Sequence, residues 1–291
     1  MKRQLIQHGP SSLTVTLPRK WILQHGLTKE DEVYLTIDEQ VHISAHEYKQ
    51  KKEATIDVTG QNHLIRRIIA SYYKAGYDTL HVHFNTAQEL ENVQKLVQDQ
   101  LAGYEITEQQ RNTMTIAMVF PEESDAFEQH FRRFMRIINQ MSSDMADAAR
   151  NKDAQWIAST ILLKVQSDKF ADICRRQLNT KNIAYAGPHY VLLEQSEKIA
   201  DHYHNLGTLL TKHIKKPTHV LTLLARQRQT LYDLYYTYSP KTLQQLHQQH
   251  QSLLALLRKK NNTIITQECY TIANLIWEMN GAVLTIRSSN T

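Results

Sequence analysis

The sequence FEQHFRRFMRIINQMSSDM spans residues 127–145 and decides the fold class of the larger part of the chain. Its apolar side chains recur at alternating spacings of four and three residues: Phe127, Phe131, Phe134, Ile138, Met141 and Met145. This spacing places them along one side of a helix, as in the seam of a helical bundle. The sequence therefore predicts a long helix that packs against other helices along its whole length.

Helical patterns continue through residues 122–291, with few turn residues between them. Breaks are predicted where Asn, Pro, Lys or Asp interrupt the apolar pattern: 151–153, 182–188, 215–217, 239–240 and 261–262. These breaks divide the segment into six helices of about 20–27 residues, which is long for a globular protein. The Lys-Lys-Pro break at 215–217 separates three helices from three more, which predicts two three-helix halves.

The segment before the bundle alternates strand and helix patterns. Strands are predicted at 54–58, 80–84, 104–107 and 113–120, and helices at 62–75 and 87–101. This β-α-β-α-β-β order is typical of a small α+β domain. His81 and His83 alternate along the second strand and are expected to share one face. A polar linker, residues 49–53, precedes the first strand.

The first 46 residues predict short strands around one short helix. Leu13, Val15 and Leu17 alternate with threonines, as in a half-buried strand. Pro18 suits the first turn of a helix, and Gly26 suits its end. Two further strands, 33–37 and 41–43, are predicted across a turn at 38–40. The chain thus divides into three predicted domains, at 1–48, 49–121 and 122–291.

Charge is unevenly distributed along a chain whose net charge is +5. Residues 1–29 contain five cations and no acid, which suits contacts to the phosphate backbone of DNA. The predicted DNA-contacting residues are four cations and two neutral donors: Lys2, Arg3, Arg19, Lys20, Ser11 and Ser12. A dimer would combine two copies of these residues on one surface. The alternative is that this segment serves only to dimerise.

Two pairs of acids one helical turn apart form a candidate metal site. Asp168 precedes Asp172 by four residues, and Glu197 precedes Asp201 by four. Like charges at this spacing repel, and a hard cation would relieve the repulsion by binding the oxygens. The nearby His202 and His204 could add nitrogen ligands for a transition metal. The alternative is an ordinary solvated face with lysines and arginines as counter-charges.

Several protein classes are not expected. The chain has no dinucleotide-binding, P-loop, serine-hydrolase or zinc-protease motif, so an enzyme is not predicted. Cys174 and Cys269 are its two cysteines and suggest no disulfide scaffold, which indicates a reducing, cytoplasmic compartment. The chain has no run of 18 apolar residues and no signal-peptide pattern, so membrane insertion is not expected. The tyrosines at 232, 235, 236 and 238 are expected to pack or to face a partner.

Three segments resemble known families. Residues 11–21, followed by Gly26-Leu27 and Asp31-Glu32-Val33, resemble the SpoVT/AbrB domain, in which two chains exchange hairpins to form a dimeric DNA-binding barrel. Residues 68–78 and 103–106 are similar to the linking region of archaeal-type PhoU regulators. The motifs Asp168 with Arg175-Arg176-x-Leu178, and residues 197–202, resemble PhoU helical bundles.

The resemblance implies a specific fold and role. The implied fold is multidomain: a swapped-hairpin β domain, a small α+β linking domain and an all-α PhoU-like six-helix bundle. The implied role is a homodimeric cytoplasmic regulator of phosphate uptake that binds double-stranded DNA. Its bundle would sense through a metal ion or dock on a phosphate transporter or sensor kinase. PhoU bundles carry paired acidic motifs in both halves, whereas here the second half has isolated acids, Asp233, Glu268 and Glu278. The alternative role is a protein-interaction adaptor that uses the hairpin domain only to dimerise.

Overall fold

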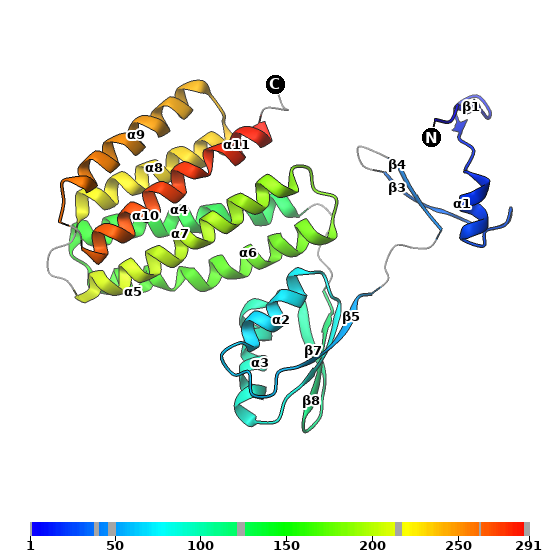
Figure 1. The fold of residues 1–291 in the computed structure, drawn as a ribbon, viewed down its shortest axis with the longest axis horizontal. Helices are drawn as coiled ribbons and strands as arrows, with labels where there is room; N and C mark the ends of the chain where they lie inside the picture. Colours follow the sequence, from blue (N-terminus) through cyan, green and yellow to red (C-terminus); the bar gives the residue numbers. More distant parts are fainter. Residues whose placement is uncertain are drawn as a thin grey trace. The chain divides into compact units, whose positions relative to one another are not determined.

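The computed structural model describes residues 2–37, 41–45, 51–120, 126–212, 217–261 and 263–287. The chain forms two compact units, Met1–Lys51 and Lys52–Thr291. The division lies three residues beyond the predicted boundary between residues 48 and 49. The order of elements along the chain, from a small strand-containing region to a helix-rich C-terminal part, agrees with the predicted layout (Figure 1).

The N-terminal unit consists of two small antiparallel hairpins and a short helix. Strand β1 (Ile6–Gln7) pairs with β2 (Leu13–Thr14), and β3 (Tyr34–Ile37) pairs with β4 (Val41–Ser44). Helix α1 (Arg19–Gln24) follows Pro18, and Gly26 has a φ of 65°, both as predicted. The strand predicted over residues 13–17 is too long: the observed strand ends at Thr14, and no described residue pairs with the chain beyond it. The predicted turn at 38–40 lies outside the described residues.

The second unit begins with an α+β part in the predicted order. Its elements are β5 (Glu53–Asp57), α2 (Ile65–Lys74), β6 (Thr79–His83), α3 (Ala87–Gln100), β7 (Tyr104–Gln109) and β8 (Thr113–Met118). The sheet order is β5-β6-β8-β7; β5 and β6 are parallel and the other neighbours are antiparallel. Helices α2 and α3 lie on one face of the sheet (Figure 1). Glu53 belongs to β5 rather than to the predicted linker.

The remaining helices form a bundle with its own hydrophobic core. They are α4 (Phe127–Asn151), α5 (Ala154–Ile161), α6 (Leu163–Thr180), α7 (Ala186–Lys212), α8 (Thr218–Tyr236), α9 (Pro240–Arg258), α10 (Ile264–Glu278) and α11 (Asn280–Arg287). All six seam residues of α4 are buried, as their spacing predicts. Helix α4 packs on α6 and α8, and α7 packs on α5 and α10.

Two of the six predicted helices are interrupted, so the prediction of six continuous helices was wrong at two places. The first break is at Leu162, whose N–H donates to the Ser159 carbonyl three residues back, in a tightened turn. The second is at Met279, where the side-chain amide of Asn280 donates to the Trp277 carbonyl at 2.5 Å. That bond competes with the backbone hydrogen bond that a continuous helix would make there. Among the described helices, none has the length and hydropathy needed to cross a membrane.

Candidate functional site

The structure brings the four predicted metal-binding acids to one area, where helices α6 and α7 pack together and α2 packs on α6. Asp168 and Asp172 are 4% and 6% exposed, although acids of this kind are rarely buried without a partner. Their partners are cations from α2 and α6, so this area is an ion-pair seam between the α+β part and the bundle. We call it the α2–α6 seam.

Lysine 164 joins one acid from each predicted pair. Its Nζ is bonded to Asp168 within α6 and lies 2.9 Å from an oxygen of Asp201 on α7. From the α+β part, Arg66 Nη2 lies 2.7 Å from Asp168 Oδ2. Asp168 therefore contacts two cations, and Lys164 links α6 to α7.

Arginine 175 contacts the remaining acid of each predicted pair, Asp172 and Glu197. Its Nη1 lies 3.2 Å from Asp172 Oδ1, and its Nη2 is bonded to Glu197 and, at 2.6 Å, to Glu194. Lys74 of α2 lies 3.7 Å from Asp172. Burial raises the pKa of the Asp172 carboxyl, and the charges of Lys74 and Arg175 only partly offset that effect.

These contacts do not fit a metal ion as the residues stand. Each of the four acids already contacts a lysine or arginine, and Lys164 holds the oxygens that an ion would need. His202 bonds Glu268 on α10 at 2.6 Å. Across the described ranges, no group of three His, Cys, Asp or Glu side chains is arranged to hold a metal. The metal site stays a prediction, and no step of the proposed function depends on it.

Arginine 176, which carried no predicted role, links the two parts most closely. Its guanidinium donates to the carbonyls of Tyr73 and Tyr77 at 2.8 and 2.7 Å and contacts Asp78 at 2.9 Å. Asn179 donates to the Lys74 carbonyl at 2.9 Å. Two side chains of α6 thus satisfy carbonyls at the C-terminal end of α2, where a helix leaves them unpaired and favours a positive charge.

Part of this seam was visible in the sequence and part was not. The spacings Lys164-x-x-x-Asp168 and Asp172-x-x-Arg175 are those of ion pairs within one helix. Arg66 and Asp168, in contrast, are 102 residues apart. No local pattern relates two such residues, because their contact depends on how α2 packs on α6.

The predicted DNA-contacting residues are all exposed. Lys2 and Arg3 precede β1, Ser11 and Ser12 lie in the turn before β2, and Arg19 and Lys20 begin α1. The Ser12 hydroxyl donates to the His8 carbonyl and so stabilises this turn. Within the described ranges, the four cations form no ion pair with an acid.

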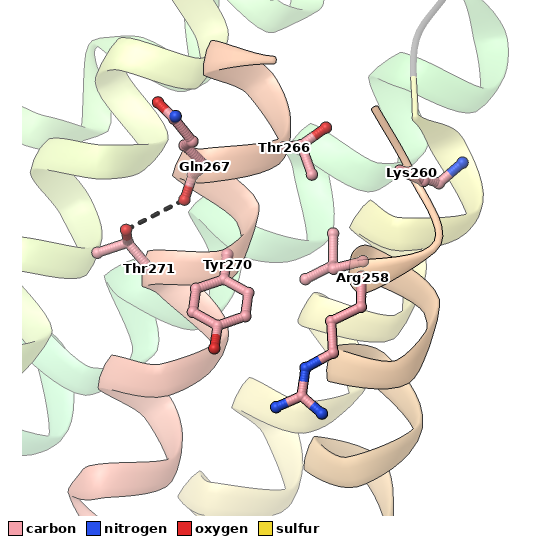
Figure 2. A pocket seen from close by; sticks show the side chains of 7 residues that line it. Arg258, Lys260, Thr266, Gln267, Tyr270 and Thr271 are labelled. Atoms are coloured by element: carbon pink, nitrogen blue, oxygen red, sulfur yellow. Dashed lines mark hydrogen bonds between the residues drawn. The ribbon is translucent and has the colours of Figure 1, made fainter. Parts of the chain in front are cut away.

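Two surface pockets lie away from the seam. One, of 350 Å³, lies between the end of α9 and the start of α10. Figure 2 shows Arg258 and Tyr270 on facing sides of it, with Lys260 at the far end. The other, of 250 Å³, lies on the open face of the sheet and is lined by His81, His83 and Glu108 among others. The prediction that the two histidines share one face is therefore confirmed.

No protein-family model, curated protein or solved structure matches this chain.

Proposed function

We propose that the protein is a dimeric DNA-binding regulator in which the N-terminal unit forms the DNA-contacting dimer. The observation that carries the proposal is that none of the described side chains of this unit is buried. Large apolar side chains stay exposed instead, including Leu13 at 63%, Leu35 at 59% and Ile37 at 76%. A chain segment this short rarely forms a sufficient core alone, and a second copy would cover these side chains.

The cations support DNA as the ligand of this dimer. Lys2, Arg3, Arg19 and Lys20 are exposed, and no acid among the described residues neutralises them, which suits contacts to phosphates. Two copies supply eight such cations. Each phosphate that they neutralise releases bound counterions, so the affinity should fall steeply as salt concentration rises.

The role of the bundle in this proposal rests on the resemblance to PhoU regulators. We propose that the protein adjusts phosphate uptake in the cytoplasm, and that the bundle docks on a phosphate transporter or a sensor kinase. The α2–α6 seam supports communication between the parts of the second unit, because Arg66, Lys74 and Arg176 join them through charged contacts.

The experiment is fluorescence anisotropy of the full-length protein with mixed-sequence duplex DNA at about 50 and about 200 mM salt. If all eight cations contact phosphates, the slope of log K against log salt approaches about −7. The variant Arg19→Glu with Lys20→Glu should lose most of the binding. A matched control reverses two exposed cations of the bundle, Lys198→Glu with Arg226→Glu, and should bind as the unmodified protein does.

The results separate the two candidate roles. Salt-sensitive binding that only the N-terminal variant loses supports the regulator. No binding at the lower salt concentration, or equal loss in both variants, contradicts it and favours an adaptor that uses this unit only to dimerise.

A further inference from the structure

Arginine 228, on α8, is fully buried in the bundle and has no acidic partner among the described residues. Its relative exposure is 0%, and its Nη2 donates to the sulfur of Met135 on α4 at 3.3 Å. Its Nε and Nη1 groups have no acceptor in the described part of the chain. Sulfur is a weak acceptor, so this guanidinium lacks strong hydrogen bonds as well as a counter-charge.

Two other buried arginines of the same unit show the usual arrangement. Arg175 contacts three carboxylates, and Arg176 contacts Asp78 and two backbone carbonyls. Buried charges in proteins are normally paired in this way, because an isolated ion in a low-dielectric interior is very unfavourable. Arg228 is the exception among the three.

The described titratable groups that act most on Arg228 include no acid. The titratable groups that interact with it most are phenols, Tyr203, Tyr236 and Tyr232. The Tyr203 hydroxyl is hydrogen-bonded to Ser142 at 2.6 Å, and the Tyr236 hydroxyl interacts with Arg132. Two more arginines of α4 border these tyrosines: Arg136 Nε donates to the Tyr232 hydroxyl at 3.3 Å, and Arg132 lies 4.6 Å from the Tyr236 ring centre.

The acids nearest this region are already engaged. Glu128 pairs with Arg132 at 3.4 Å, and Asp233 is exposed and accepts from Gln229 at 2.8 Å. Burial lowers the pKa of Arg228 to about 10, so the guanidinium stays protonated at neutral pH. Buried water could satisfy its hydrogen bonds, but water carries no charge to neutralise it.

We propose that Arg228 is the base of an internal anion site between α4 and α8, which takes a small inorganic anion such as chloride or a simple oxyanion. The ion must be small, because Arg228 has no exposed surface and neither of the two pockets described above is lined by it. This site is independent of DNA binding, so the two proposals can fail separately.

The test is thermal unfolding of the full-length protein in sodium chloride, sulfate or phosphate, compared with sodium gluconate at equal pH and ionic strength. Gluconate serves as the reference because it is too large for such a site. For an anion present at about 100 times its Kd, Tm should rise by about 5–10 °C over gluconate. The anion that gives the largest rise separates a halide site from an oxyanion site.

The decisive variant is Arg228→Met, which removes the charge but keeps a long side chain. Because an apolar residue often replaces a buried ion without loss of stability, we expect the variant to fold. Sulfate and phosphate stabilise folded proteins generally by exclusion from their surface, so the variant should keep that general rise in Tm and lose the rest of the anion response. Arg226→Met, at an exposed position on the same helix, should keep the full anion response.

Two outcomes overturn the proposal: no anion raises the Tm of the unmodified protein above its value in gluconate, or Arg228→Met responds as the unmodified protein does. Should Arg228→Met not fold, crystals of the unmodified protein grown in bromide decide the question. An anomalous bromide peak within hydrogen-bond distance of the Arg228 guanidinium supports the site, and peaks confined to the surface contradict it.

Discussion

Glycine 76 shows how one residue couples the two parts of the second unit. It follows α2 with a φ of 84°, a conformation that costs other residues about 1–2 kcal/mol. A Cβ atom there would lie 2.3 Å from Cγ2 of Thr180 on α6. The backbone at the end of α2 therefore approaches α6 more closely than any other residue would allow.

We predict that Gly76→Ala destabilises the protein by about 2–4 kcal/mol, through backbone strain plus the clash. The control is Gly60→Ala: Gly60 has a φ of 73°, but a Cβ atom there would have no neighbour within 4 Å, so only the strain applies. Thr180→Ser, which removes Cγ2, should recover the difference between the two variants. Urea unfolding measures all three, and equal losses for Gly76→Ala and Gly60→Ala would refute the close contact.

Histidine 189 is a buried imidazole whose protonation opposes folding. Its Nδ1 faces the Tyr185 carbonyl at 3.0 Å and its Nε2 faces the Tyr235 hydroxyl at 2.9 Å, an arrangement that suits the neutral ring. Burial lowers its pKa below the ordinary 6.5. The unfolded chain therefore binds a proton more readily than the folded one, and stability is lost as pH falls below about 6.5.

We predict that His189→Phe flattens this acid-side loss. A single group can change the free energy of unfolding by at most about 1.4 kcal/mol per pH unit. Some dependence of stability on pH should remain in the variant, because burial also lowers the pKa of His250. The measurement is the free energy of unfolding in urea at pH values of about 7.5, 6.0 and 5.0, which bracket the ordinary histidine pKa. His81→Phe, at an exposed position, is the control; an unchanged slope in His189→Phe would show that another group dominates.

At the scale of elements, α6 is the helix that holds the second unit together. It contributes to the bundle core, and it also satisfies the end of α2 through Arg176 and Asn179. The acids at 168 and 172 are consequently part of an interface rather than a free polar face.

We predict that Arg176→Met costs about 2–4 kcal/mol, because it removes the cationic partner of Asp78 and one of the donors to each of the Tyr73 and Tyr77 carbonyls. The α+β part should also exchange its amide hydrogens faster than the bundle does, since its main charged link to α6 is lost. Urea unfolding and hydrogen exchange check these two effects. Arg111→Met, exposed on the β7–β8 connection, should change neither; similar behaviour of both variants would contradict the role of Arg176.

At the scale of the whole molecule, the two units differ in how they are stabilised. The second unit has two hydrophobic clusters, one under the sheet and one in the bundle. The N-terminal unit has no buried side chain among its described residues, which is the basis of the dimer proposed above.

We predict that the full-length protein is a dimer and that Leu35→Asp with Ile37→Asp makes it a monomer. Both side chains are on one face of β3, and each charge would disfavour burial against a second copy. Light scattering after size-exclusion chromatography gives the mass. Leu64→Asp, which changes an exposed leucine of the second unit, should leave the dimer intact. A monomeric unmodified protein would remove the basis of the proposed DNA-binding surface.

The sequence by itself determined the order of the predicted strands and helices, although not the interruptions at Leu162 and Met279, because helix and strand periodicity is a local property. The seam of α4, the β-α-β-α-β-β order and the glycine-ended helices α1 and α2 all follow from spacings of a few residues. Tertiary structure alone decided which charges meet between different helices. By their spacing, Asp168 and Asp172 suited either a metal ion or a solvated face, and packing brought Arg66 and Lys74 against them instead. Nothing local set Arg228 apart from other cations, and packing buried it. The physical reason is that burial and ion pairing depend on segments far apart in the chain, 102 residues in the case of Arg66 and Asp168, which no local pattern records.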